Sequence, residues 1–241
     1  ADQRQTLTCR RTAKVDVTAS ARGKTDGLQV KAQTTSGALE FSLHIAGRHN
    51  VKNALAATAC ALAAGIPLDC IAAGLSAFVP VKGRSRALSV ALQGRTLTLI
   101  DDTYNANPDS VAAAIEVLAA LPGPRLLVLG DMGEVGDQGP QFHAEAGGLA
   151  QQRGIETLFT LGELSKAAVA PFGPAARHFE SMEALQAAVK AEVPRLASVL
   201  VKGSRFMKME RVVATLTDHL SPHKDTTLMA NLSKPGVPAC C

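Results

Sequence analysis

Residues 97–108 read LTLIDDTYNANP, so an apolar segment, a polar cluster and a helix start follow one another within twelve residues. The apolar segment that ends at Ile100 predicts a buried strand. Asn107-Pro108 is typical of the first turn of a helix, where the missing N–H of proline costs nothing. Because ligands bind beyond the carboxyl ends of strands in open α/β sheets, this stretch predicts both a fold and a place for its site.

Strands and helices alternate around this stretch. Strands are predicted at 87–92, 96–100, 125–129, 157–161 and 197–201, and helices at 109–121, 141–153, 164–170, 181–191 and 206–220. The first two strands are joined by a hairpin turn at Gln93-Gly94. The alternation predicts an α/β fold whose mostly parallel, Rossmann-like sheet carries helices on both faces.

The N-terminal third has a different pattern. Short alternating runs predict strands at 6–9, 13–19, 27–32 and 39–45, followed by helices at 49–64 and 68–78. Pro80–Gly83 is interpreted as a linker, so we divide the chain into domains at 1–80 and 81–220. Periodicity is lost after Leu220, which predicts a disordered tail over 221–241.

Composition excludes several classes of protein. The 241 residues are 46% apolar and carry a formal net charge of +4 without a clustered basic patch, which argues against nucleic-acid binding. The sequence shows neither a membrane-spanning stretch nor a signal peptide, so we expect a cytoplasmic protein without membrane insertion, and a monomer. Cys60 and Cys70 lie in alanine-rich apolar segments, which predicts buried, reduced thiols.

A first polar cluster follows the strand that ends at Ile100. The carboxylate of Asp102 is suited to binding a ribose diol, as acidic residues do in nucleotide-binding folds. The alternative is that Asn107 only caps the next helix. Capping explains neither the adjacent carboxylates nor the neighbouring Tyr104 and Asn105, so we expect a ligand site here.

Two more strand ends carry polar clusters. Gly130–Gly136 has three glycines that let a ligand approach the backbone, but its spacing is not that of a dinucleotide-binding loop. Lys202, Ser204 and Arg205 precede a helix and together suit a carboxylate or phosphate group. The alternatives are a plain turn at the first cluster and a solvated basic turn at the second.

Two asparagines mark the start of the helix predicted at 49–64. Asn50 and Asn53 are three residues apart and share one face, where side-chain amides can pair with an adenine edge. The alternative is that Asn50 is the N-cap of the helix. The sequence has no phosphate-binding loop and no metal-ligand spacing.

The order of these motifs resembles the Mur ligase family of ATP-dependent amide ligases. The motifs are Gly-x-His-Asn-x-x-Asn at 47–53, Gly83-Arg84, Asp-Asp-Thr-Tyr-Asn-Ala-Asn-Pro at 101–108, Gly-Asp-Met-x-Glu-x-Gly at 130–136 and Val-Lys-Gly-Ser-Arg at 201–205. The resemblance covers about residues 27–220. The first and last strand-end motifs look most like the family member that joins D-alanyl-D-alanine to UDP-N-acetylmuramoyl-tripeptide.

The resemblance implies the organisation and the reaction. Residues 1–80 would be the end of a central ATPase domain, and 81–220 a C-terminal Rossmann-like domain. ATP would phosphorylate the tripeptide carboxylate, and the amine of D-alanyl-D-alanine would attack the acyl phosphate. The Mg²⁺ ligands and the phosphate-binding loop are upstream in the family, so we expect this segment to be inactive alone.

The resemblance also implies residue roles. Asn50 and Asn53 are similar to asparagines beside adenine, Arg84 to a linker arginine that reaches the ATP phosphates, and Asp102 to the ribose-binding aspartate. The residues matched to substrate contacts are Tyr104, Asn105, Asn107, Asp131, Glu134, Lys202, Ser204 and Arg205. Lys82 replaces the usual proline of the family linker, which predicts a looser hinge.

Two other classes remain open at this stage. A non-catalytic Rossmann-like module that holds a small anion or a partner protein would need only the turn Lys202–Arg205. An NAD-dependent dehydrogenase is less supported, because the glycine spacing does not fit. A raised KM for ATP in Asp102→Ala would favour the ligase over the module.

Overall fold

The structure, a computed structural model, describes residues 5–11, 13–24, 27–45, 47, 49–92 and 94–218. It divides between Pro80 and Val81 into two compact units. The predicted tail over 221–241 and the last two residues of the helix predicted at 206–220 lie outside the described residues.

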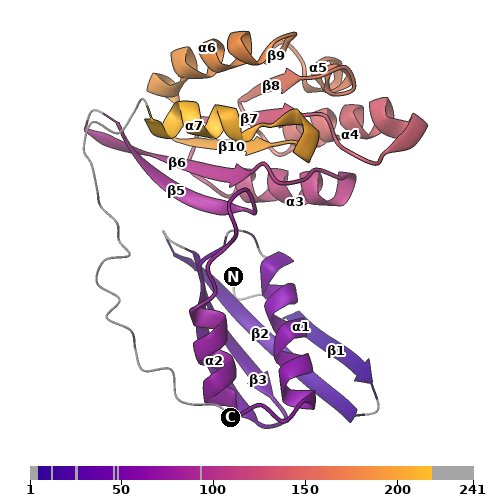
Figure 1. The fold of residues 1–241 in the computed structure, drawn as a ribbon, viewed down its shortest axis with the longest axis vertical. Coiled ribbons are helices and arrows are strands. Elements are labelled where there is room, and N and C mark those ends of the chain that lie inside the picture. Colours follow the sequence, from indigo (N-terminus) through magenta and orange to yellow (C-terminus); the bar gives the residue numbers. More distant parts are fainter. Residues whose placement is uncertain are drawn as a thin grey trace. The chain divides into compact units, whose positions relative to one another are not determined.

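The first unit is an antiparallel sheet with two helices on one face (Figure 1). Its strands follow the chain in the order β1 (Gln5–Arg11), β2 (Ala13–Lys24), β3 (Gly27–Thr34) and β4 (Gly37–Leu43). The helices are α1 (His49–Ala63) and α2 (Leu68–Ser76). Alternate residues of β4, including Phe41, are buried against apolar residues of the helices such as Leu55 and Ile71, so the sheet and helices share one core.

The cysteine predictions are wrong except for the reduced state of Cys60. Cys60 is a free but exposed thiol, and Cys70 is half-buried and disulfide-bonded. Both lie in alanine-rich helices, in which small apolar residues occur on every side. Periodicity therefore could not show which face of these helices would be buried.

The second unit confirms the predicted α/β fold with a mostly parallel sheet. Its strands are β5 (Arg86–Leu92), β6 (Arg95–Asp102), β7 (Arg125–Gly130), β8 (Thr157–Leu161), β9 (Ala176–Phe179) and β10 (Ser198–Lys202). They lie in the order β5-β6-β10-β7-β8-β9, and within this sheet β5 alone runs antiparallel to its neighbour. Strand β9 was not predicted, because its four residues ARHF contain no apolar run.

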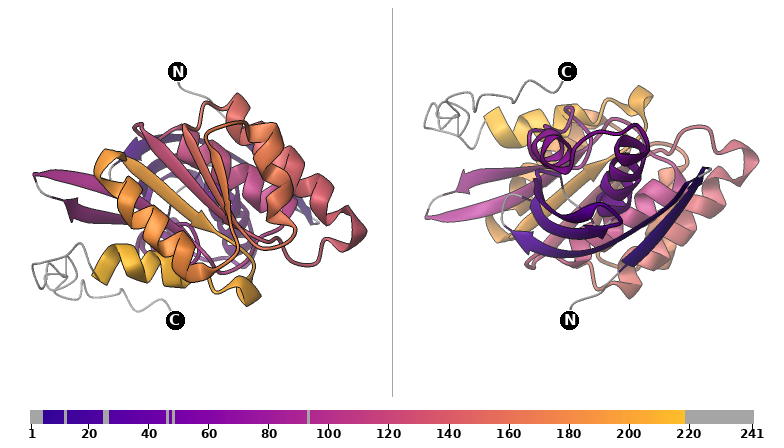
Figure 2. Two further views of the ribbon diagram at one scale, coloured as in Figure 1. Left: turned by 90° about the horizontal axis from the view of Figure 1, so that it is seen from above. Right: turned by 90° about the horizontal axis from the view of Figure 1, so that it is seen from below.

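Helices cover both faces of this sheet (Figure 2). They are α3 (Pro108–Ala119), α4 (Gly139–Gln152), α5 (Val169–Phe172), α6 (Met182–Glu192) and α7 (Glu210–Asp218), with short 3-10 turns η1 (Gly136–Gln138), η2 (Ser165–Ala168), η3 (Val193–Arg195) and η4 (Arg205–Met207). The main core lies between the sheet and α6 and α7, where side chains such as Leu185, Val189 and Leu216 are fully buried.

The helix predicted at 206–220 is broken. Residues Arg205–Met207 form η4, Lys208 has a left-handed φ of +51°, and α7 starts only at Glu210. The apolar stripe was correct, since Met209 and Val213 are buried. The interruption could not be read from periodicity, because a left-handed lysine leaves the apolar spacing almost unchanged.

The chain order explains why the polar clusters meet. From β6 the chain passes through α3 to β7, and it returns from β9 through α6 to insert β10 between β6 and β7. The carboxyl ends of β6, β10 and β7 are therefore neighbours at one edge of the sheet. Among the described residues, no helix has the length and hydropathy needed to span a membrane.

Candidate functional site

Three loops at the carboxyl edge of the second sheet are joined by backbone hydrogen bonds. The N–H of Gly133 donates to the carbonyl of Ala106 at 3.0 Å, and the N–H of Ser204 donates to the carbonyl of Asp131 at 2.9 Å. The loop after β7 is thus held by the loop after β6 on one side and the loop after β10 on the other. We call residues 101–107, 130–135 and 202–205 the strand-end region.

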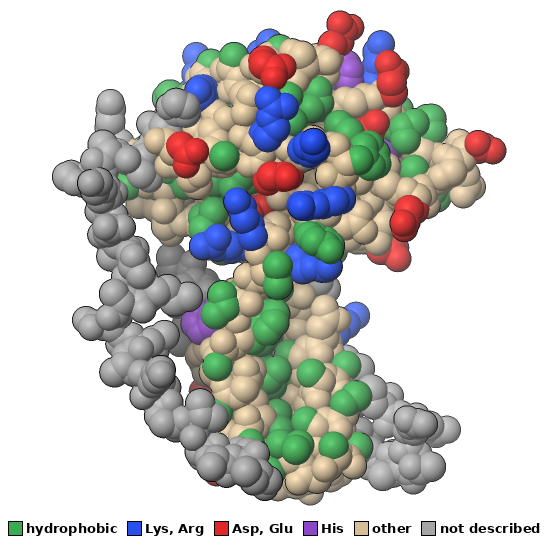
Figure 3. Space-filling view, in the orientation of Figure 1, with side chains coloured by type: hydrophobic (Ala, Val, Ile, Leu, Met, Phe, Trp, Pro, Cys, Tyr) green, Lys and Arg blue, Asp and Glu red, His purple; other side chains and the backbone are tan. Residues whose placement is uncertain are grey.

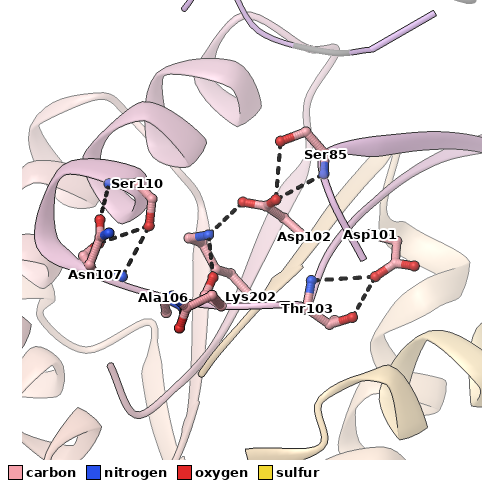
Figure 4. Close-up of polar contacts among 9 residues, drawn as sticks. Ser85, Asp101, Asp102, Thr103, Ala106, Asn107, Ser110 and Lys202 are labelled. Carbon is pink, nitrogen blue, oxygen red and sulfur yellow. Dashed lines mark hydrogen bonds and ion pairs between the residues drawn. The ribbon is translucent and has the colours of Figure 1, made fainter. Parts of the chain in front are cut away.

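Asp102 and Lys202 form an ion pair inside this region (Figure 4). Nζ of Lys202 donates to Oδ2 of Asp102 at 2.6 Å and to the carbonyl of Asn105 at 2.8 Å. Ser85 donates to Oδ1 of Asp102 through its N–H at 2.8 Å and its Oγ at 3.0 Å. The side chain of Lys202 is 2% exposed and that of Asp102 15% exposed, so little of the pair reaches solvent.

This pairing limits what the two residues can offer a ligand. The sequence predicted that Asp102 would bind a ribose and that Lys202 would bind the dipeptide. The parallel register places these residues side by side, and neither charge is readily buried without a partner. Lys202 therefore contacts Asp102 and Asn105 in place of solvent, whereas Asp102 keeps a small exposed fraction.

The adjacent carboxylate, Asp101, has a different environment (Figure 4). Its Oδ1 accepts from Oγ of Thr103 at 2.7 Å, and its Oδ2 accepts from the N–H of Gly83 at 3.1 Å. Asp101 is 1% exposed. This role of Asp101 was not predicted, although successive side chains of a strand point to opposite faces and this alternation separates the two carboxylates.

The end of the linker, at Gly83, and the residues that follow it are bound to the end of β6. Gly83 accepts at its carbonyl from the N–H of Tyr104 at 2.9 Å, next to the bonds that Gly83 and Ser85 make to Asp101 and Asp102. Gly83 has a φ of +83°, and a Cβ there would lie 3.0 Å from the backbone nitrogen of Tyr104, so glycine is required. We call the contacts of residues 83–85 with residues 101–104 the linker clamp.

Two exposed arginines lie over the ring of Tyr104. Tyr104 is 40% exposed, and the guanidinium carbons of Arg84 and Arg205 lie 4.1 Å and 5.7 Å from its ring centroid. Lys82 and Lys208 are also exposed, and Figure 3 shows Lys and Arg side chains gathered near the ends of β6 and β10. Guanidinium groups held on an aromatic ring and open to solvent suit an anionic ligand.

The two asparagines after Tyr104 use their side chains locally. Asn107 is the N-cap of α3: its Oδ1 accepts from the N–H of Ser110 at 2.8 Å, and Oγ of Ser110 accepts from the N–H of Asn107 at 3.0 Å. Oδ1 of Asn105 accepts from the N–H of Ala106 at 2.9 Å. The capping alternative is thus observed at Asn107 (Figure 4).

The acids of the loop after β7 differ in exposure. Oδ1 of Asp131 accepts from the N–H of Ser165 at 2.8 Å, and Asp131 is 7% exposed, so its carboxylate holds the loop after β8. A Cβ on Gly162 would lie only 2.4 Å from that oxygen. Glu134 is exposed and has a φ of +57°, which is uncommon outside glycine.

A buried histidine supports the same loop. His143 is 0% exposed; its Nε2 accepts from the N–H of Met132 at 2.9 Å, and its Nδ1 lies 2.7 Å from the carbonyl of Gly139. Burial lowers the pKa of His143 below its ordinary value, although the contact with Gly139 and the charge of Asp131 oppose this shift. No sequence motif singled out His143, because its partners are backbone groups.

Ser204 is buried with an unsatisfied hydroxyl. Among the described residues, the buried side-chain oxygens that lack a hydrogen-bond partner are Oγ of Ser204 and Oε2 of Glu210, and Ser204 is 2% exposed. Close packing surrounds it: a Cβ on the preceding Gly203 would lie 2.6 Å from Cγ of Met209. Buried polar atoms normally have partners, so this hydroxyl marks a position where a ligand or water would bind.

Asn50 and Asn53 belong to the first unit and are not part of the strand-end region. Nδ2 of Asn53 donates to Oδ1 of Asn50 at 3.2 Å, so the two amides share one face of the first turn of α1, as the spacing predicts. Because α1 begins at His49, Asn50 lies inside the helix and does not precede it.

The chain is similar to known proteins in sequence and in fold. The family model described as "Mur ligase, glutamate ligase domain" matches residues 84–205. The chain is 38% identical over 195 residues to the UDP-N-acetylmuramoyl-tripeptide–D-alanyl-D-alanine ligase of Escherichia coli. This match covers 80% of this chain and 42% of the relative. The Bacillus subtilis ligase of the same name is 36% identical over 185 residues, with 74% and 40% covered.

Solved structures show the same fold. A crystal structure of MurF from Acinetobacter baumannii superposes with a TM-score of 0.72 at 34% identity and covers 82% of this chain and 44% of that chain. MurF from Thermotoga maritima in complex with ADP gives a TM-score of 0.72 at 20% identity, with 87% and 47% covered. The chain spans about two fifths of the curated relatives it matches, 42% of the first. The family model matches the chain from Arg84 to the end of the Lys202–Arg205 turn. The chain therefore belongs to the Mur ligase family.

Proposed function

We propose that this chain is part of an ATP-dependent cytoplasmic amide ligase that adds D-alanyl-D-alanine to UDP-N-acetylmuramoyl-tripeptide. The similar proteins from Escherichia coli and Bacillus subtilis carry that name. Residues 1–80 would complete a central ATP-binding domain, and residues 81–220 would form the domain that closes over the nucleotide and presents the dipeptide.

The observation that carries this proposal is the unpartnered hydroxyl of Ser204. It is buried where the three loops of the strand-end region meet, next in sequence to the exposed guanidinium of Arg205. A dipeptide zwitterion has a carboxylate for a guanidinium and polar atoms for a buried hydroxyl. We assign Ser204 and Arg205 to the dipeptide, with the exposed Glu134 as a further candidate contact.

Other predicted contacts receive supporting roles. Lys202 would position Asp102 and the Asn105 carbonyl from inside, because its ammonium already binds both. Asp131 would hold the loop after β8, and Asn107 would begin α3. Tyr104 would hold Arg84 and Arg205 on its ring.

For the nucleotide, we assign the phosphates to Arg84, which is exposed and held on Tyr104. Oδ2 of Asp102 accepts one bond from Lys202 and has a second lone pair available for a ribose hydroxyl. Asn50 and Asn53 would pair with the adenine edge. ATP would supply the phosphoryl group that activates the tripeptide carboxylate, and Arg84 would neutralise phosphate charge.

Magnesium would be held outside the described part of this chain. Among the described residues, no group of three or more His, Cys, Asp or Glu side chains could hold a metal ion. In the proposed ligase, the ligands of the cation that accompanies ATP would come from the longer ligase and from the phosphates themselves. For this reason we expect the 241-residue chain alone to release no ADP in the presence of D-alanyl-D-alanine.

A chimera tests this proposal. Residues 81–218 would replace the matching segment of the Escherichia coli relative, and ADP release would be measured with the tripeptide nucleotide and the dipeptide. We expect release that requires both substrates. Arg84→Ala should raise the KM for ATP, whereas Arg177→Ala should not, although Arg177 also lies over aromatic rings, those of Phe159 and Phe179.

Two outcomes would contradict the proposal. A folded but inactive chimera, together with phosphate binding by the isolated chain, would favour the non-catalytic module. ADP release by the isolated 241 residues would contradict our assignment of phosphate and magnesium binding to other parts of the ligase.

A further inference from the structure

A relay of hydrogen bonds runs from α4 to Ser204. The carbonyl of Gly139 accepts from Nδ1 of His143 at 2.7 Å, and Nε2 of His143 accepts from the N–H of Met132 at 2.9 Å. The carbonyl of Asp131 then accepts from the N–H of Ser204 at 2.9 Å. The first bond lies within α4, the second joins α4 to the loop after β7, and the third joins that loop to the loop after β10.

The centre of this relay is a single peptide group. The N–H of Met132 and the carbonyl of Asp131 belong to the same planar unit, so a bond that orients one end also orients the other. His143 holds the N–H end and Ser204 is held by the carbonyl end. Hydrogen bonds in series polarise one another, which strengthens the bond to Ser204 as long as His143 accepts.

The geometry determines the tautomer of His143. Nε2 receives a backbone N–H and so carries no proton, which leaves Nδ1 to donate to the Gly139 carbonyl. The ring is fully buried, and the charged group that acts on it is the carboxylate of Asp131. A protonated Nε2 would face the N–H of Met132, so the relay requires the neutral ring.

We infer that His143 is a positioning residue that, through the Asp131–Met132 peptide, sets the position of Ser204 for the incoming dipeptide. The inference rests on the proposed function for the dipeptide, but the relay itself does not. A purely space-filling histidine would need the same volume and no particular acceptor. The two roles therefore predict different responses to substitutions that keep different nitrogen positions.

Glutamine and asparagine provide that test. The amide oxygen of His143→Gln reaches about as far as Nε2 and can accept from Met132, whereas the shorter amide of His143→Asn reaches only the position of Nδ1. In NMR spectra of the 241-residue chain, the imidazole ¹⁵N shifts should show a neutral ring with the proton on Nδ1. Amide exchange at Met132 and Ser204 should quicken about tenfold or more in His143→Asn and stay near the parent rate in His143→Gln.

The control amide is that of Leu185 in α6, which bonds to Ser181 away from the relay. Its exchange should not change in either variant. Equal acceleration of all three amides, equal behaviour of the two variants, or a proton on Nε2 would overturn the relay.

Kinetics of the chimera test the link to the dipeptide. We expect His143→Asn to raise the KM for D-alanyl-D-alanine about tenfold without changing the KM for ATP, and His143→Gln to restore most of the loss. If exchange follows the relay but the dipeptide KM does not change, the assignment of Ser204 to the dipeptide fails and the relay stands. If the chimera is inactive with its parent histidine, the proposed function fails, and the exchange data still decide the relay.

Discussion

The ends of β6 and β10 lie side by side, yet they treat polar groups in opposite ways. At the end of β6, Asp101 and Asp102 make hydrogen bonds with both of their carboxylate oxygens. After β10, the buried hydroxyl of Ser204 has no partner among the described residues. Arg205 is largely exposed, although its Nη1 lies 3.8 Å from Oε1 of Glu210. A residue type alone therefore does not identify a ligand contact. A polar atom that already has hydrogen-bond partners in the protein stabilises the structure of the strand ends, whereas a polar atom without such partners can still bind a ligand.

The largest expected effect on the free energy of unfolding tests the ion pair between Lys202 and Asp102. Lys202→Met removes a buried ammonium from Asp102 and the Asn105 carbonyl, and we expect a loss of about 3–5 kcal/mol in the free energy of unfolding, because breaking a buried pair leaves a charge without its partner. Urea unfolding measured by circular dichroism would give this value. The control is a double-mutant cycle with Asp102→Asn: the two losses should be far from additive, and simple additivity would show that the pair contributes little.

A glycine tests the close packing that holds Ser204. A Cβ in Gly203→Ala would lie 2.6 Å from Cγ of Met209 and 3.3 Å from Cα of Gly130, so we expect a loss of about 1–3 kcal/mol in the free energy of unfolding. Gly148→Ala is the matched control, since its nearest atom, in Pro171, is 3.8 Å away. This helical substitution should stabilise the protein by about 0.5–1 kcal/mol. Equal effects at the two glycines would show that the packing around Gly203 adapts easily.

The smallest expected effect on the free energy of unfolding compares two buried hydroxyls, that of Ser198 in β10, which has a hydrogen-bond partner, and that of Ser204 after β10, which has none among the described residues. Oγ of Ser198 donates to the carbonyl of Pro122 at 2.8 Å, so Ser198→Ala should cost about 1 kcal/mol of the free energy of unfolding. Ser204→Ala removes an unsatisfied group and should cost nothing, while raising the KM for the dipeptide in the chimera. A stability loss at Ser204 equal to that at Ser198 would mean that its hydroxyl has a partner, and would end the contrast between the strand ends.

The sequence predicted most of the fold because the main signals were local. The antiparallel pair of β5 and β6, the apolar strands and the helix stripes need only the spacing of neighbouring residues. Strand β9 and the break at Lys208 were missed for the same reason: a short charged edge strand and a single left-handed residue change the apolar pattern very little.

The sequence predicted three separate polar loops, and it did not predict the hydrogen bonds that join them. The rule that ligands bind beyond strand ends located all three loops, since it requires only the strand positions. It could not show that Lys202 lies opposite Asp102, because that depends on the insertion of β10 between β6 and β7. Nor could it find His143, whose partners are the backbone groups of Met132 and Gly139.

The linker clamp has a kinematic consequence. Gly83 is bonded to Asp101 and Tyr104, and Ser85 is bonded to Asp102. Because of these bonds, residues 83–85 must move together with β6 as one rigid body. Backbone rotation next to this segment would then be concentrated before Gly83, where Lys82, unlike a proline, leaves φ unrestricted. In the proposed ligase, the backbone of Arg84 would already be held by the linker clamp, so its contact with the ATP phosphates would cost little conformational entropy.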